Sequence, residues 1–78
     1  MNEIQIEILE KLIRNKYIGG KHTSEDNVCK GFPKHEIKKV RKELKKLIKQ
    51  GYVISKPTSY GLEMSINPKM LKEIKKRL

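Results

Sequence analysis

The residues with the greatest capacity for chemistry are one cysteine and two histidines: His22, Cys29 and His35. A thiolate and two imidazoles are groups that zinc binds well, but zinc sites usually carry short paired spacings such as CxxC or HxxxH. Neither spacing occurs here, so we expect no metal ion. His22 is better interpreted as a structural residue. His35 either donates to a base edge or a phosphate, or is an ordinary surface histidine.

Catalytic patterns are missing as well. The acidic residues are scattered, and no paired carboxylates, phosphate-binding loop or Ser-His-Asp set stands out. A lone buried or surface cysteine is a weak argument for nucleophilic catalysis. The sequence therefore predicts no enzyme, no cofactor and no small-molecule ligand.

The balance of charge is the strongest compositional signal. Nineteen Lys and Arg stand against nine Asp and Glu, which gives a formal net charge of +10 over 78 residues. An excess of this size favours a polyanionic partner such as DNA, RNA or an anionic membrane surface. No apolar run is long enough for a membrane span and no signal peptide is recognisable. We expect a cytoplasmic chain without a membrane partner, and the single cysteine fits a reducing compartment.

The cations gather on one predicted helix, which runs from Pro33 to Gly51. Proline suits the first turn of a helix and glycine suits its end. Apolar residues recur on one side with helical periodicity: Ile37, Val40, Leu44, Leu47 and Ile48. The other side is cationic, with Arg41 and Lys45 on one flank and Glu43 on the other. This pattern predicts a helix that packs on a core and presents lysines to a polyanion, although a merely solvated charged face is the alternative.

Shorter elements surround this helix in the prediction. An amphipathic helix covers 2–18 with Asn2 as its cap, and a brief helix covers 24–30. After Gly51 the pattern changes to the alternation of strands, and a two-stranded hairpin is predicted with a tip at 56–61. In its second strand Leu62, Met64 and Ile66 should face inward, and Glu63 and Ser65 outward. A last helix begins at Asn67-Pro68, and 21–23 is either a stub strand or a loop.

This order of elements resembles the winged helix-turn-helix superfamily, in particular its small, basic, archaeal-type members. The stretches that carry the resemblance are TSEDNVCKG, FPKHEIKKVRKELKKLIKQGYVI and SKPTSYGLEMSI. At 78 residues the chain should form a single domain, 1–78, and the resemblance implies an α+β, mainly α, fold. It would have a three-helix core, a two-stranded β-hairpin wing and a C-terminal helix.

The resemblance also implies a double-stranded DNA-binding protein, either a transcription regulator or a general DNA-binding protein. The recognition helix, 34–50, would enter the major groove, and the wing, 56–61, would lie on the backbone. The implied contact residues are Lys34, His35, Lys38, Lys39, Arg41, Lys42, Lys45, Lys46, Lys56, Thr58, Ser59 and Tyr60. Lysine is a flexible point charge, so this set favours phosphate contact over base readout.

Several alternatives stay open at this stage. The domain could dock proteins within a larger nucleic-acid complex, or it could bind RNA. RNA recognition by base stacking needs aromatic side chains, and the chain has one Phe and three Tyr. Tyr60 could pack back on the hairpin. The C-terminal helix could form a homodimer, as helices after the wing often do in the superfamily, or it could cap the core.

Overall fold

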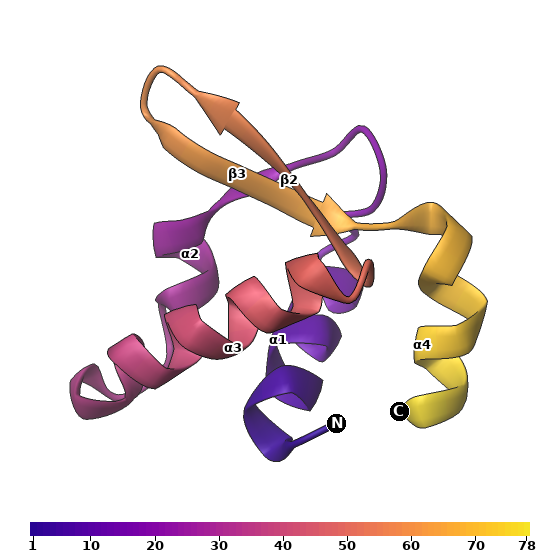
Figure 1. Cartoon of the computed structure of the whole chain (residues 1–78), viewed down its shortest axis with the longest axis horizontal. Helices are drawn as coiled ribbons and strands as arrows, with labels where there is room; N and C mark the ends of the chain where they lie inside the picture. Colours follow the sequence, from indigo (N-terminus) through magenta and orange to yellow (C-terminus); the bar gives the residue numbers. More distant parts are fainter.

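Helices pack around a small core, and a short antiparallel sheet closes one side of it (Figure 1). The structure is a computed structural model that describes residues 1–78. Its elements in chain order are α1 (Glu3–Arg14), β1 (Thr23–Ser24), α2 (Glu25–Cys29), the 3₁₀ turn η1 (Lys34–Glu36), α3 (Ile37–Lys49), β2 (Val53–Thr58), β3 (Gly61–Ile66), the 3₁₀ turn η2 (Pro68–Met70) and α4 (Leu71–Arg77). The predicted α+β class is confirmed.

The first helix begins as predicted and ends earlier. The side chain of Asn2 accepts from the backbone N–H of Gln5 at 2.9 Å, and the Gln5 side chain accepts from the N–H of Asn2 at 3.3 Å. This reciprocal capping box satisfies two donors that the helix cannot use itself. The helix ends at Arg14 rather than near residue 18, because Lys16 turns the chain with φ 60° and residues 17–19 then pair with β3. The N–H of Ile66 donates to the carbonyl of Tyr17 at 2.8 Å.

The long basic helix is also shorter than predicted at its start. Pro33 is extended, with ψ 145°, so it precedes the helix instead of forming its first turn. A 3₁₀ turn follows, and regular α-helix runs only from Ile37 to Lys49. Gly51 closes the far end with φ 86°, the left-handed conformation expected of it.

The sheet has three strands in the order β1-β3-β2. The sequence predicted only the two strands of the hairpin and did not decide whether the segment before α2 is a strand. β1 pairs with β3 through Thr23 and Met64, so the stub at the end of the first loop is a true strand. β2 extends to Thr58 and includes Pro57, which leaves a tip of two residues in place of the predicted 56–61. Proline is tolerated because β2 lies at the edge of the sheet.

Ser65 corrects the predicted alternation of the second hairpin strand. It was expected to face solvent, but it is completely buried, and its hydroxyl donates to the carbonyl of Gly19 at 2.8 Å. The segment from Tyr17 to Gly19 covers this side of β3, since Ile18 bridges to Ile66. The strand therefore has no fully open face at this position.

The core consists of twelve buried apolar residues drawn from helices and strands alike. They are Ile8, Leu9, Leu12, Val28, Cys29, Val40, Leu44, Leu47, Val53, Met64, Ile66 and Ile74. Every predicted inward residue of α3 from Val40 to Leu47 belongs to this set, and Ile37 and Ile48 pack against its edge.

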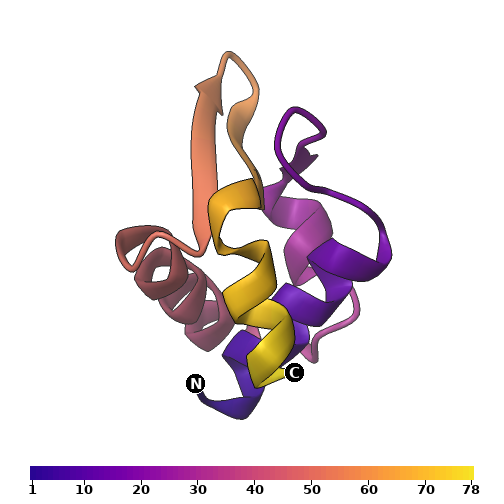
Figure 2. The same ribbon diagram turned by 90° about the vertical axis from the view of Figure 1, so that its right-hand side faces the viewer.

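The last helix lies at the opposite end of the molecule from the hairpin tip (Figures 1 and 2). The side chain of Asn67 accepts from the N–H of Lys69 at 3.1 Å, and Pro68 opens the 3₁₀ turn, as the sequence predicted. Ile74 is fully buried in the core, whereas Leu78 is 48% exposed. None of the helices combines the length and the apolar character that crossing a bilayer requires.

Candidate nucleic-acid interface

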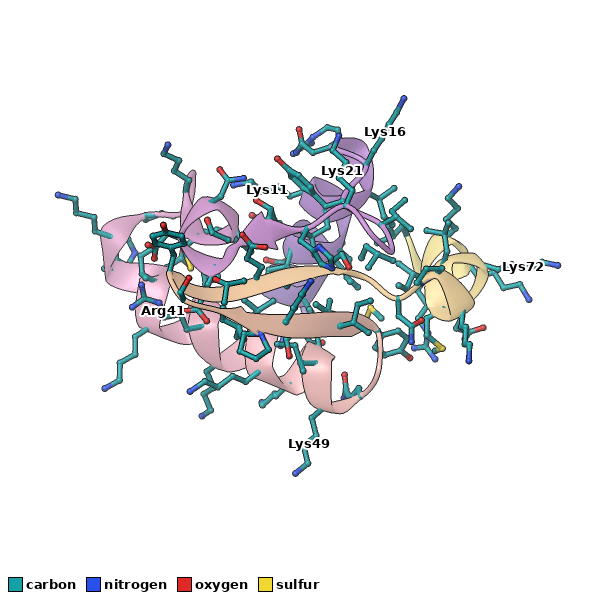
Figure 3. All side chains as sticks on the ribbon, turned by 90° about the horizontal axis from the view of Figure 1, so that it is seen from above. Lys11, Lys16, Lys21, Arg41, Lys49 and Lys72 are labelled. Carbon is teal, nitrogen blue, oxygen red and sulfur yellow. The ribbon has the colours of Figure 1, made fainter.

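The outward side of α3 is an open cationic surface. Val40, Leu44 and Leu47 have no exposed area, so the helix has one fixed orientation on the core. The lysines on its other side are all exposed, and so are the two basic residues of η1: Lys34, His35, Lys38, Lys39, Lys42, Lys45, Lys46 and Lys49. We call this set of side chains the α3 surface. Because all eight residues are exposed, neither the hairpin nor α4 covers them, and Figure 3 shows Lys49 pointing away from both.

A shallow hollow runs along the flank of this helix. It is lined by Ile37 and by four cations, Lys38, Arg41, Lys42 and Lys45. An open depression with this lining can accept an anionic group of a large ligand. It gives no enclosed volume in which a small substrate would be separated from water.

Arg41 differs from the lysines because it already has acidic partners. Its Nε lies 3.3 Å from a carboxylate oxygen of Glu25, and its Nη2 lies 3.4 Å from one of Asp26. Both acids stand in the first turn of α2, where negative charge suits the helix start. The guanidinium therefore ties α3 to α2, and its hydrogen-bonding fork is partly occupied in the free protein.

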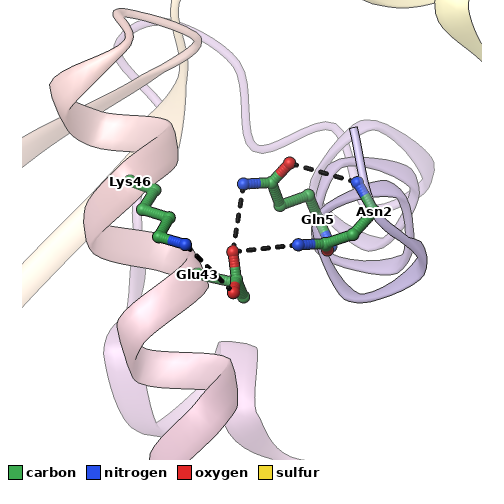
Figure 4. A network of polar contacts seen from close by, with 4 residues as sticks. All are labelled: Asn2, Gln5, Glu43 and Lys46. Atoms are coloured by element: carbon green, nitrogen blue, oxygen red, sulfur yellow. Dashed lines mark hydrogen bonds and ion pairs between the residues drawn. The ribbon is translucent and has the colours of Figure 1, made fainter.

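Glu43 is the residue of α3 that the sequence placed least well. It was expected on the flank of the helix, but it is only 5% exposed and lies against the start of α1. Its Oε1 accepts from the side-chain amides of Asn2 at 3.0 Å and Gln5 at 3.1 Å, and Lys46 Nζ lies 3.7 Å from its Oε2 (Figure 4). The spacing could have indicated its burial, because Glu43 stands three residues after Val40 and four before Leu47, both of which are buried.

The charge of Glu43 is stabilised by these contacts. The hydrogen bond from Asn2 lowers the pKa of the Glu43 carboxyl, and the ammonium of Lys46 lowers it further, against the opposing effect of burial. Lys46 is in consequence the one lysine of the α3 surface with an acidic partner. It is less free than its neighbours to meet a phosphate.

Lys11 performs a structural task that the sequence did not reveal. Its ammonium donates to three backbone carbonyls at the end of α2: Asn27 at 2.6 Å, Val28 at 3.3 Å and Lys30 at 2.5 Å. A cation at this place satisfies carbonyls that the short helix leaves open. Partial burial lowers the pKa of Lys11. The contact fixes α2 on α1 and so fixes the acids that hold Arg41.

The hairpin carries its predicted residues at the exposed tip, Ser59 and Tyr60, and on the adjoining part of β2, Lys56 and Thr58. Lys56 and Ser59 are exposed, and the side chain of Tyr60 is completely exposed, so it does not pack back on the hairpin. Thr58 is used by the turn itself. Its hydroxyl donates to the carbonyl of Gly61 at 2.7 Å and accepts from the N–H of Tyr60 at 3.3 Å.

The metal-binding residue types do not come together. No group of three or more His, Cys, Asp or Glu side chains is placed to hold a metal ion. Cys29 is buried, and burial raises the pKa of its thiol, which keeps it protonated and unreactive at neutral pH. His22 is half-buried and His35 is exposed.

Comparison with known proteins adds no relative to this description. No family model matches the chain, and neither a curated protein nor a solved structure is detectably similar to it.

Proposed function

We propose that this chain is a winged helix-turn-helix domain that binds duplex DNA, mainly through phosphates. In this proposal α2 and α3 form the helix-turn-helix, with the turn at 30–33. The β2–β3 hairpin is the wing. The element order and the exposed, protruding hairpin tip support the assignment (Figure 1). The start of α3 would lie in the major groove and the wing along the backbone.

The observation that carries the proposal is the unpaired charge of the α3 surface. Between residues 34 and 49 the chain has eight Lys or Arg and two Glu. Only Arg41 and Lys46 have an acidic side chain within ion-pair distance, so six lysines have none. Like charges four residues apart, such as Lys38 and Lys42, repel each other by a few tenths of a kcal/mol per pair. A row of phosphates removes that repulsion and releases counterions.

The same residues favour binding that depends little on base sequence. Base edges are read best by planar, bidentate groups, of which arginine is the commonest. Arg41 is the only arginine of α3, and its fork contacts Glu25 and Asp26. The remaining cations are lysines, which contact phosphates as point charges. We therefore favour a general DNA-binding role over readout of a single operator.

A titration of labelled duplexes tests the proposal. Duplexes of unrelated sequence should bind with similar affinity, and binding should weaken steeply with salt. If about six phosphates are neutralised, the slope of log K against log salt should be about −5. The variant K38E/K42E should bind at least about tenfold more weakly. K16E/K21E changes the charge by the same amount on another side of the molecule and should have a smaller effect (Figure 3).

Other outcomes identify the alternatives. Tight binding to one sequence only would indicate a transcription regulator. Preference for RNA of the same length over the duplex would indicate an RNA-binding domain. No binding to any nucleic acid, with both variants folded, would refute the proposal and favour a protein-docking module.

A further inference from the structure

The positive charge of the molecule is concentrated in two segments. Residues 34–49 contribute a net +6, from eight Lys or Arg and two Glu. Residues 68–78 contribute a net +4, from five Lys or Arg and one Glu. The rest of the chain contains six Lys or Arg and six Asp or Glu, so it is neutral. The whole excess of +10 therefore comes from α3 with its preceding turn and from α4 with its preceding turn.

The cations of the second segment form a surface of their own. Ile74 is fully buried, which fixes the side of α4 that faces the core. Lys72 and Lys76 stand two residues before and after it, so at about 100° per residue they point away from the core. Lys69, Lys75 and Arg77 are exposed beside them. We call these five residues the α4 surface.

Most of this charge has no partner within the protein. Glu73 is the only acid of the segment, and it lies 3.4 Å from Nε of Arg77. The four lysines are in no ion pair. Lys72 and Lys76 are four residues apart on one helix, so their charges repel each other in the free protein.

The two cationic surfaces point in different directions. Lys49 of the α3 surface and Lys72 of the α4 surface point to different sides of the molecule, and Arg41 lies toward the end opposite Lys72 (Figure 3). The start of α3 and the hairpin tip lie at one end of the long axis, which extends 31 Å, and α4 lies at the other (Figure 1). We therefore expect a duplex that lies across this end, on the start of α3 and the hairpin tip, to leave the α4 surface uncovered.

We infer that the α4 surface is a second binding site for duplex DNA, and that one molecule can hold two duplex segments together. This inference rests on the proposed function, because it assigns the first duplex to the α3 surface. Backbone phosphates are the ligand, since the α4 surface offers lysine ammonium groups and one ion-paired arginine but no free planar donors for base edges. A molecule with two such sites can bridge two duplexes, and the stability of the bridged complex then depends on the affinity of each site.

A capture experiment with two duplexes tests this inference. One duplex is fixed to beads and loaded with protein, unbound protein is washed away, and a fluorescent duplex of unrelated sequence is added. The wild type should retain the second duplex. K72E/K76E should load onto the beads within about threefold of wild type but retain at least about tenfold less of the second duplex. K16E/K21E, with the same change in charge, should retain it like the wild type.

The controls separate the two proposals. If the wild type does not load onto the beads at all, the proposed function fails and the bridge fails with it. If the protein loads but retains no second duplex, or if K72E/K76E retains it as well as the wild type, only the inference is refuted.

Measuring the mass of the free protein distinguishes a second DNA site on α4 from a homodimer contact on α4. Sedimentation of the free proteins should give a monomer for the wild type and for K72E/K76E, because a symmetric α4 contact would bring like charges together. A wild-type dimer that becomes a monomer in K72E/K76E would overturn the second-site assignment, since the bridge would then join two protein copies.

Discussion

Glu43 of α3 accepts a hydrogen bond from the side chain of Asn2, the residue that caps α1. The contact spans 41 residues of sequence and joins the start of one helix to the middle of another. It places the only buried carboxylate of the molecule on the core side of the helix that carries the α3 surface. An ionised group thus adds to the apolar contacts that hold this helix against α1.

Acid should weaken the fold through Glu43. Its pKa is lower in the folded state than in the unfolded state, so its contribution is fully present above the unfolded value, about 4.3. That contribution is lost as the pH falls through the lower folded value. Urea unfolding at pH 7 and at about pH 3 should show a larger loss of stability for wild type than for Glu43→Gln. Equal losses in both proteins would contradict this assignment.

Removing the ammonium of Lys11 should destabilise the protein without changing its core. Lys11→Met keeps most of the apolar stem but leaves three carbonyls at the end of α2 without their donor. We expect a loss of about 1–3 kcal/mol in the free energy of unfolding, measured by chemical denaturation. The matched control is Arg14→Met, which removes an exposed cation from the same helix and should change stability by less than about 0.5 kcal/mol. Similar losses in the two variants would show that the three carbonyls do not need the ammonium.

Neutralising the partners of Arg41 should strengthen DNA binding. In the variant Glu25→Gln/Asp26→Asn the guanidinium loses its ion pairs and becomes available to a phosphate. Because Arg41 and Asp26 are exposed and Glu25 is half-buried, the fold should lose no more than about 1 kcal/mol. Duplex affinity should rise several-fold, and more than in Glu7→Gln/Glu10→Gln, which removes two acids from α1. The same gain in both variants would show that only net charge matters.

Tyr60 should matter for binding and not for folding. Its side chain is completely exposed at the hairpin tip, so Tyr60→Ala should change the free energy of unfolding by less than about 0.5 kcal/mol. If the hairpin lies on the DNA backbone, duplex affinity should fall measurably, and Tyr60→Phe will show whether the hydroxyl is responsible. Unchanged affinity in Tyr60→Ala would remove the tip from the proposed interface.

Features with a local cause could be predicted from the sequence. The stripe from Ile37 to Ile48 follows from helical spacing, and the caps at Asn2 and Asn67 follow from the preference of short polar residues for helix starts. The exposed lysines of α3 follow from the same stripe. These features depend on neighbours within a few residues, which any single sequence contains.

Features that depend on distant contacts could not be predicted. Thr23 and Ser24 are a strand only because β3 offers an open edge, and Ser65 is buried only because the loop after α1 returns to cover it. The ammonium of Lys11 and the carboxylate of Glu43 resemble surface charges until their partners are brought close by the fold. Each is a pairing between segments whose positions are decided by packing.

The position of Pro57 on an edge strand should protect the protein against aggregation at high concentration. A free strand edge normally invites a neighbouring chain to add its own strand, which leads to aggregates. On β2 the proline lacks the N–H that such an addition would use, and Lys56 beside it adds charge. We therefore expect neighbouring copies to come close together without joining their sheets into an amyloid-like array.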